Sequence, residues 1–227
     1  MLYWIVGLLV VIAILYYWLI ILTEGVFLGR WLVIWLYDIT AYRYDKIKEY
    51  AMEDEEVLVV EPVLAGTRTV APRLLDVATG TGRVPYFLLA DGRFKGEIVA
   101  VDASQKMLDH AKNRIEQLPH DQQAHITLQK YPATSLAFPD ESFDIVTSLE
   151  ALEFFPNDRA ALQEMVRVLR GGGFLMVTRR REWEGWTFLW RYRSRERMKR
   201  LVESCGVSRV QVLNWQSNYD LVVGYKR

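Results

Sequence analysis

Two aspartates and two glycines stand where a nucleotide-like ligand would need them. In LLDVATGTGRVPYFLL (residues 74–89), Asp76 ends an apolar run, and Gly80 and Gly82 follow in a short turn. Glycine permits positive φ and close approach of a ligand to the backbone, and the N–H groups that open the following helix lack helical partners. Asp102 ends the next apolar run, in VAVDAS, where a carboxylate can accept hydrogen bonds from both ribose hydroxyls of a nucleoside. These residue types predict a nucleoside-binding site.

A dinucleotide site is the first alternative, because it also uses a glycine turn between a strand and a helix. Its fingerprint is G-x-G-x-x-G, whereas Pro85 stands at the third glycine position here. Proline is acceptable in the first turn of a helix, but its presence weakens the dinucleotide interpretation. The glycine turn by itself leaves the ligand open.

Short apolar runs alternate with amphipathic stretches from residue 74 onward, which is the pattern of βαβ units in a parallel sheet. The sequence predicts strands over residues 73–77, 97–102, 126–130, 143–148 and 173–178. It predicts helices over residues 83–89, 104–117, 158–169 and 194–205. The final stretch, VQVLNWQSNYDLVVGYK, holds two strand-like runs separated by Ser217-Asn218, which favours a hairpin at one edge of the sheet.

Five segments, in order along the chain, carry the motifs of one enzyme family. DVATGTG is similar to D-x-G-x-G-x-G, VDASQKMLDHAKNR to a second-strand motif, and LAFPDESFDIVTS to L-P-F-x-D-x-S-F-D. ALQEMVRVLRGGGFLMVT is similar to a helix, glycine turn and fifth strand, and YDITAYRYD (residues 37–45) to the helix motif Y-D-x-x-A-x-x-Y-D. Together they resemble class I S-adenosylmethionine-dependent methyltransferases over residues 37–227. The resemblance implies an α/β fold with a Rossmann-like seven-stranded sheet, mostly parallel with a C-terminal antiparallel hairpin, and S-adenosyl-L-methionine as the cofactor.

The resemblance also implies a role for each matching residue. Asp102 would bind the ribose, and Asp76 would orient the glycine turn and reach the cofactor's amino group directly or through water. Gly80, Thr81 and Gly82 would pack under the methionine part of the cofactor, and Ala78 and Thr79 complete this cofactor-binding turn. Met107 or its neighbour Ala103 would flank the adenine, with the N–H of Ala133 serving the ring. Ser148 and Leu149 would line the floor near the sulfonium. Tyr37 and Tyr44 would close the site from the N-terminal helix; alternatively, Tyr44 packs that helix on the sheet.

Two positions depart from the family pattern. Ala78 replaces the first glycine, a change that we expect to be tolerated on a backbone of negative φ. Pro132, in KYPATSLAF, replaces the Asp that usually accepts a hydrogen bond from the adenine amino group, and proline offers neither a carboxylate nor an N–H. One lost hydrogen bond costs about 0.5–1.5 kcal/mol, or about tenfold in affinity, so cofactor binding is weakened without being abolished.

Glu150 and Glu153, in SLEALEFF, follow the fourth predicted strand beside the expected sulfonium position. An oxygen or carbon acceptor needs a base, and an amine must lose a proton before attack. Our hypothesis is that one of these carboxylates orients or deprotonates the acceptor, with Tyr44 as the third catalytic candidate. The alternative is that the carboxylates are simply acidic residues favoured at a helix N-terminus.

The first 23 residues carry no charge and are mostly Leu, Ile, Val, Tyr and Trp. A helix of that length, at about 1.5 Å per residue, reaches roughly 35 Å and spans a hydrocarbon core of about 30 Å. A cleaved signal peptide would begin with basic residues, whereas here the basic residues follow the segment, between Arg30 and Lys48. That asymmetry places the rest of the chain on the cytoplasmic side. We predict a single-pass membrane protein with a transmembrane anchor over residues 1–24, an interfacial N-terminal helix or a re-entrant segment within 25–50, and a methyltransferase domain over 51–227.

Composition limits the partners. The 28 Lys and Arg residues balance the 28 Asp and Glu residues, so net charge gives no case for nucleic acid. The three His residues lack metal-ligand spacing and Cys205 is the single cysteine, so we predict no metal and no internal disulfide. The acidic run over residues 53–56 is expected as solvated surface. The segment RRREWEGWTFLWRYRSRERMKR combines Arg with Trp and suits anionic lipid headgroups, with nucleic acid as the rival partner.

The sequence therefore predicts a membrane-anchored methyltransferase. Its expected partners are the lipid bilayer and an apolar small-molecule or lipid acceptor, such as a quinone precursor, an aminophospholipid or another isoprenoid lipid. The alternative is a catalytically weak accessory subunit that keeps the fold and assembles with other membrane-protein subunits.

Overall fold

A seven-stranded sheet forms the centre of the structure, a computed structural model that describes residues 2–48 and 52–227. The strand order is β3-β2-β1-β4-β5-β7-β6. The first five strands pair in parallel, and β7 runs antiparallel to both β5 and β6. The strands are β1 (Arg73–Val77), β2 (Glu97–Asp102), β3 (Ile126–Lys130), β4 (Phe143–Ser148), β5 (Leu169–Arg180), β6 (Val207–Asn214) and β7 (Tyr219–Lys226). The predicted α/β sheet with a C-terminal antiparallel hairpin is confirmed.

One strand differs from its prediction, because β5 begins at Leu169 and not at residue 173. Phe143 pairs with Leu169, whereas Ile145 pairs with Phe174, so β5 contains extra residues opposite β4. Such a bulge lets a strand start early while the later residues keep their register. The glycines at 171–173, which indicated a turn in the sequence, lie inside this irregular stretch.

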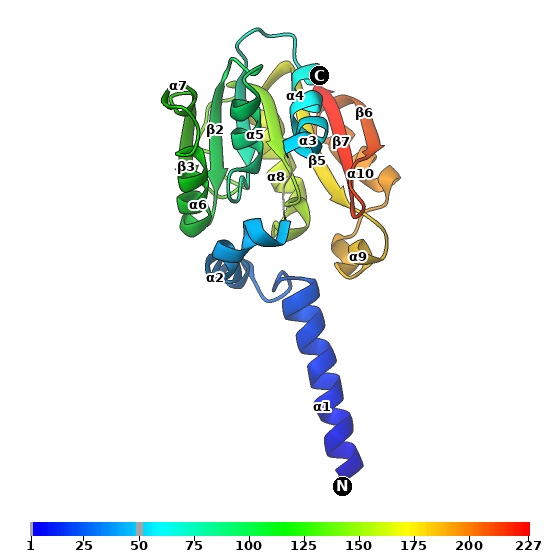
Figure 1. The fold of residues 1–227 in the computed structure, drawn as a ribbon. Helices are drawn as coiled ribbons and strands as arrows, with labels where there is room; N and C mark the ends of the chain where they lie inside the picture. Colours follow the sequence, from blue (N-terminus) through cyan, green and yellow to red (C-terminus); the bar gives the residue numbers. More distant parts are fainter. Residues whose placement is uncertain (1, 49–51) are drawn as a thin grey trace.

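Helices pack on both faces of the sheet (Figure 1). They are α5 (Arg83–Asp91), α6 (Gln105–Ile115), α7 (His120–Gln123), α8 (Asp158–Val168) and α10 (Arg195–Ser204). Successive residues of a strand point to opposite faces. Leu74 therefore joins the core under α5 with Leu88, whereas Leu75 joins the core under α8 with Leu162.

Side-chain caps fix where three of these helices begin. The Ser104 hydroxyl accepts a hydrogen bond from the N–H of Met107 at the start of α6, and Asn157 caps α8 by accepting from the N–H of Ala160. Ser194 caps α10 in the same way. Caps of this kind typically stabilise a helix by about 1 kcal/mol. The Ser104 cap also holds the loop after β2 in place.

The N-terminal part begins with α1 (Leu2–Tyr16), which continues as a π-helical stretch over Tyr17–Leu22 and projects away from the sheet (Figure 1). Residues Tyr3–Leu22 have a mean hydropathy of 2.9 and none is buried, so this helix is long and apolar enough to cross a membrane. After a turn come α2 (Arg30–Lys48), α3 (Met52–Glu55), a π-helical turn (Glu56–Val60) and α4 (Glu61–Gly66). Val59 and Val63 are buried against the sheet beside Leu74, so the chain joins the domain core before β1.

Candidate functional site

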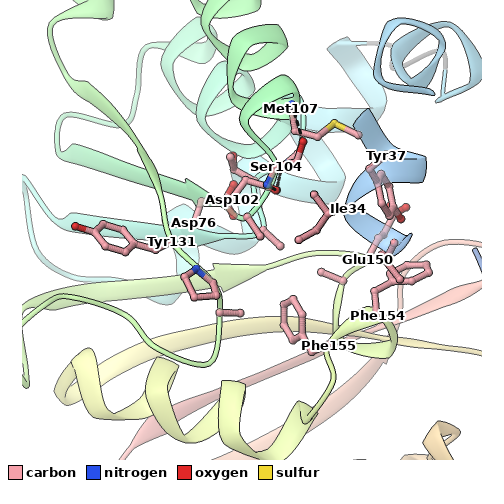
Figure 2. A pocket seen from close by; sticks show the side chains of 18 of the residues that line it. Ile34, Tyr37, Asp76, Asp102, Ser104, Met107, Tyr131, Glu150, Phe154 and Phe155 are labelled. Carbon is pink, nitrogen blue, oxygen red and sulfur yellow. Dashed lines mark hydrogen bonds between the residues drawn. The ribbon is translucent and has the colours of Figure 1, made fainter. Parts of the chain in front are cut away.

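A cavity of about 1130 Å³, counted with the open space at its mouth, lies at the carboxyl ends of β1, β2 and β4 (Figure 2). In parallel α/β sheets ligands bind at this edge. The structure brings most of the predicted site residues to its wall. They are Tyr37, Asp76, Ala78, Thr79, Gly80, Thr81, Asp102, Ala103, Met107, Ala133, Leu149 and Glu150.

Asp102 links the two loops at the polar part of the cavity. One carboxylate oxygen accepts a hydrogen bond from the N–H of Gly80 at 2.9 Å, and the other accepts from the N–H of Ser104 at 2.8 Å. Burial raises the pKa of Asp102, although these backbone N–H groups counteract it. Since each carboxylate oxygen has two acceptor sites, both oxygens can still accept a ligand hydroxyl. Asp102 thus fits the predicted ribose contact and has a second, structural role.

Asp76 is buried at the end of β1 with one oxygen unused. The Thr147 hydroxyl donates to Oδ1 at 2.7 Å, whereas Oδ2 has no hydrogen-bond partner among the residues that the structure describes. Burial raises the pKa of Asp76 to about 6, against the opposing hydrogen bond from Thr147. A buried unpaired carboxylate oxygen is costly, and a cationic amino group placed in the cavity would satisfy it.

The two glycines of the turn serve different purposes. Gly80 has φ +56°, and a Cβ there would meet nothing within 4 Å, so this face of the turn is open to a ligand. Gly82 does not line the cavity: a Cβ there would lie 3.1 Å from that of Ala111. The small size of Gly82 thus serves the close approach of α5 to α6, and its place under the cofactor stays a prediction.

Ala78 also differs from its expectation. Its φ is +57°, in the left-handed region, where we expected a negative angle. A Cβ in that conformation costs roughly 1–2 kcal/mol. The backbone thus keeps the conformation of the glycine motif, and the alanine at the first position of the motif is strained.

Glu150 lies on the cavity wall and belongs to a buried charge cluster that the sequence did not reveal. Arg83 Nη1 donates to Glu150 Oε1 at 2.6 Å, and Arg83 Nε and Nη2 each bind Glu55 at 2.8 Å. Glu55 is only 2% exposed, so the expectation that the acidic run is solvated surface is wrong for this residue. Arg83 follows the glycine turn directly, but nothing in the sequence pairs it with an acidic residue 28 positions earlier.

Two predicted site residues face elsewhere. Glu153 lies outside the cavity wall, where its carboxylate accepts a hydrogen bond from the Tyr219 hydroxyl at 2.6 Å and lies 3.3 Å from Arg180 Nε. It sits in a 3₁₀ turn (Leu152–Phe154), which turns its side chain toward the β7 side. Ser148 is fully buried, and its hydroxyl has no partner among the described residues and does not line the cavity. The third predicted catalytic residue, Tyr44, belongs to the part of α2 whose side chains the structure does not describe.

Helix α2 supplies the apolar side of the cavity. Val33, Ile34 and Tyr37 line it from α2, and the ring of Tyr37 meets that of Phe154 edge-on at 5.8 Å. Figure 2 shows Tyr37, Phe154 and Glu150 at the side of the cavity away from Tyr131, with Asp76 and Asp102 between. A hydrogen bond between Ser104 and Asp38 ties α2 to the start of α6. Apart from Tyr37, these wall residues belong to no motif, and no signal in the sequence identified them.

The residues present fit S-adenosylmethionine. Asp76 offers an unpaired acceptor for an amino group, Asp102 retains acceptor sites for ribose hydroxyls, and Gly80 leaves the backbone open. Met107 and Ala133 add an apolar lining beside them. Pro132 also lines the cavity, so the position at which the family pattern has an Asp lies on the cavity wall.

Part of the chain is similar to known proteins. Residues 75–177 match a family model described as a methyltransferase domain. A demethylmenaquinone methyltransferase of Clavibacter sepedonicus is 36% identical over 118 residues, which are 50% of this chain and 45% of that protein. The chain thus spans about half the length of the curated relatives that it matches.

Two solved structures share the fold. An S-adenosylmethionine-dependent methyltransferase of Aquifex aeolicus has a TM-score of 0.64 and 18% identity, covering 81% of this chain and 98% of its own. A phosphoethanolamine N-methyltransferase of Haemonchus contortus, in complex with S-adenosylhomocysteine, has a TM-score of 0.67 and 16% identity, covering 83% of this chain and 57% of its own. These two structures show that the sheet has the fold of class I S-adenosylmethionine-dependent methyltransferases, and residues 75–177 carry the similarity to the methyltransferase domain model.

Proposed function

We propose that this chain is a membrane-anchored methyltransferase that methylates an apolar acceptor of the quinone-precursor type. The observation that carries the proposal is the division of the cavity. Asp76 and Asp102 line its middle, where a polar cofactor would bind. Ile34, Phe154 and Phe155 form an apolar wall beside them. An acceptor with an aromatic or isoprenoid body suits that wall, and the similarity to a demethylmenaquinone methyltransferase supports the same acceptor class.

The proposed chemistry assigns work to few residues. When bound, S-adenosylmethionine supplies an electrophilic methyl group, which the acceptor takes in an in-line displacement. Asp76 and Asp102 hold and orient the cofactor, and the apolar wall excludes water and positions the acceptor, an effect that contributes much of the rate in such displacements. Glu150, positioned by Arg83, takes the proton that the acceptor loses. Glu153 faces away from the cavity and has no part in this proposal.

The N-terminal helix supports the membrane part of the proposal. Residues Tyr3–Leu22 are exposed and apolar, a combination that water disfavours and a bilayer satisfies. The basic residues between Arg30 and Lys48 favour the cytoplasmic side for the domain.

Cofactor binding is the first test. We would titrate S-adenosylmethionine and S-adenosylhomocysteine into the purified full chain by calorimetry, with Asp102→Ala as the site variant and Asp140→Ala, an exposed carboxylate outside the cavity, as its control. Micromolar binding that Asp102→Ala loses and Asp140→Ala keeps is the expected result. Absence of binding at millimolar ligand contradicts the proposal and favours an accessory subunit.

Acceptor class is the second test. Quinone precursors, aminophospholipids and other isoprenoid lipids would be offered in vesicles with radiolabelled S-adenosylmethionine. Methyl transfer to the quinone precursors alone is expected, and transfer to aminophospholipids alone overturns the acceptor assignment while keeping the enzyme.

A further inference from the structure

The end of the anchor is fixed to a distant part of the methyltransferase domain. The indole N–H of Trp18 donates to the carbonyl oxygen of Thr187 at 3.0 Å, and the Trp18 ring stacks on Phe27 at 5.2 Å. Phe27 in turn meets Trp190 edge-on at 5.0 Å. Thr187 lies between α9 (Glu182–Trp186) and a 3₁₀ turn (Leu189–Arg191). The end of the anchor helix is therefore held against the domain by direct contacts.

This contact determines the depth of residues 186–190 if the anchor spans a bilayer. Trp18 lies four residues before Leu22, the end of the apolar span, and hence about 6 Å inside it at about 1.5 Å per residue. Thr187 contacts Trp18 and so lies near the boundary between hydrocarbon and headgroups. Trp186 and Trp190, which flank it, are 64% and 75% exposed. Tryptophan is enriched at that depth of a membrane.

Helix α2 presents a similar face on the other side of the anchor. Trp31, Trp35 and Ile39 recur at intervals of four residues, so they share one helix face, and all three are exposed. The turn between the anchor and α2 packs closely on that helix, because a Cβ on Gly25 would lie 3.1 Å from both Leu32 and Leu36. Figure 1 shows α2 and α9 on either side of the point where α1 meets the domain.

The same elements enclose the apolar side of the cavity. Phe154, on the cavity wall, packs edge-on against Tyr37 of α2 and against Phe188 at 5.7 Å. Arg191 Nη1 donates to the carbonyl oxygen of Phe155, another wall residue, at 2.8 Å. The segments that carry the exposed tryptophans therefore also contact the apolar side of the cavity.

We propose that Trp31, Trp35, Trp186 and Trp190 form one interfacial surface that rests on the lipid bilayer and holds the apolar side of the cavity at the membrane. The inference rests on the proposed anchor, since the bilayer position comes from residues 3–22. A lipid surface is the partner that fits, because the surface continues the anchor. An apolar acceptor dissolved in the bilayer then reaches the cavity without crossing water.

The test places an environment-sensitive label at single cysteines in the full chain. On a Cys205→Ser background, Trp190→Cys and Trp31→Cys would carry a nitrobenzoxadiazole fluorophore, and Trp186→Cys gives a further position where one variant fails to fold. Val70→Cys is the matched control: Val70 is 88% exposed, and its loop, between α4 and β1, lies at the end of the molecule farthest from α1 (Figure 1). The proteins would be reconstituted in vesicles of phosphatidylethanolamine and phosphatidylglycerol.

We expect severalfold brighter, blue-shifted emission at positions 31, 186 and 190, quenched by lipids that carry a shallow nitroxide, and no such response at position 70. Water-like emission at all four positions, in protein that still resists alkaline carbonate extraction, overturns the interfacial surface and leaves the anchor standing. Release of the protein by carbonate overturns the anchor and the surface with it. The calorimetric test of cofactor binding is independent of both results.

Discussion

Arg83 and Glu150 form a buried ion pair on the cavity wall, with 2.6 Å between Nη1 and Oε1. Both side chains are less than a tenth exposed. Glu55, which precedes the sheet in the chain, supplies the second carboxylate and accepts hydrogen bonds from Arg83 Nε and Nη2. A residue of the N-terminal segment thus helps to hold the proposed base in place, and breaking such a pair by removing one partner is typically costly.

Glu150→Gln tests the base directly. The amide keeps the shape of the side chain but cannot accept a proton, so we expect kcat to fall about 10²- to 10⁴-fold while the dissociation constant of the cofactor stays unchanged. Glu164→Gln is the control, because Glu164 also pairs with an arginine, Arg167, but lies outside the cavity. Unchanged turnover in Glu150→Gln excludes the base role.

The raised pKa of Asp76 predicts how stability depends on pH. Because burial raises this pKa from 3.8 to about 6 in the folded chain, the folded state holds the proton more tightly than the unfolded state. The free energy of unfolding therefore falls as pH rises from about 4 to about 6, by up to about 3 kcal/mol. Asp76→Asn should reduce this slope, and the part that remains comes from other buried carboxylates with raised pKa values, such as Asp102. Thermal unfolding of the detergent-solubilised chain without cofactor would measure the difference.

Asp91 provides a control of opposite sign for that experiment. Hydrogen bonds from Arg93 lower the pKa of Asp91, so its contribution is present above the ordinary pKa and is lost as pH falls. Asp91→Asn should leave the slope between pH 4 and 6 in place. An Asp76→Asn variant with the slope of the unmodified chain contradicts the assignment.

The left-handed backbone at Ala78 predicts a stabilising glycine. Ala78→Gly relieves roughly 1–2 kcal/mol of strain in the folded state. It also gives the unfolded chain more conformational entropy, which lowers stability by about 0.4–1 kcal/mol. We expect the melting temperature to stay level or to rise slightly. Ala161→Gly, inside helix α8, should lower it, since glycine there costs about 1 kcal/mol relative to alanine. Equal losses in both variants are incompatible with a positive φ at Ala78.

Pro132 predicts an improvement in cofactor affinity. Pro132→Asp places a carboxylate acceptor on the cavity wall beside Ala133, and one added hydrogen bond contributes about 0.5–1.5 kcal/mol, or up to about tenfold in affinity. Pro132→Ala is the control, because it removes the ring without adding an acceptor. The gain should appear with S-adenosylhomocysteine in calorimetry. No gain, or the same gain in Pro132→Ala, means that the adenine does not lie against this position.

The sequence by itself determined the sheet, the glycine turn and the two aspartates. These features are local: hydrophobic periodicity marks each strand, and the motif places Asp76 and Gly80 a few residues apart, so both reach the same edge of the sheet. The resemblance to methyltransferases then implied a mostly parallel seven-stranded sheet with a C-terminal antiparallel hairpin. The apolar helix at residues 3–22 could also be predicted from composition alone.

Only the tertiary structure decided which way individual side chains face and which distant segments meet. Glu150 and Glu153 are equivalent by sequence, yet a 3₁₀ turn directs Glu153 to Tyr219, whereas Glu150 meets Arg83. Glu55 looked like surface charge and is buried, and Trp18 contacts Thr187 from the far half of the chain. Contacts of such long sequence separation depend on how the packed core brings segments together, and local periodicity carries no information about them.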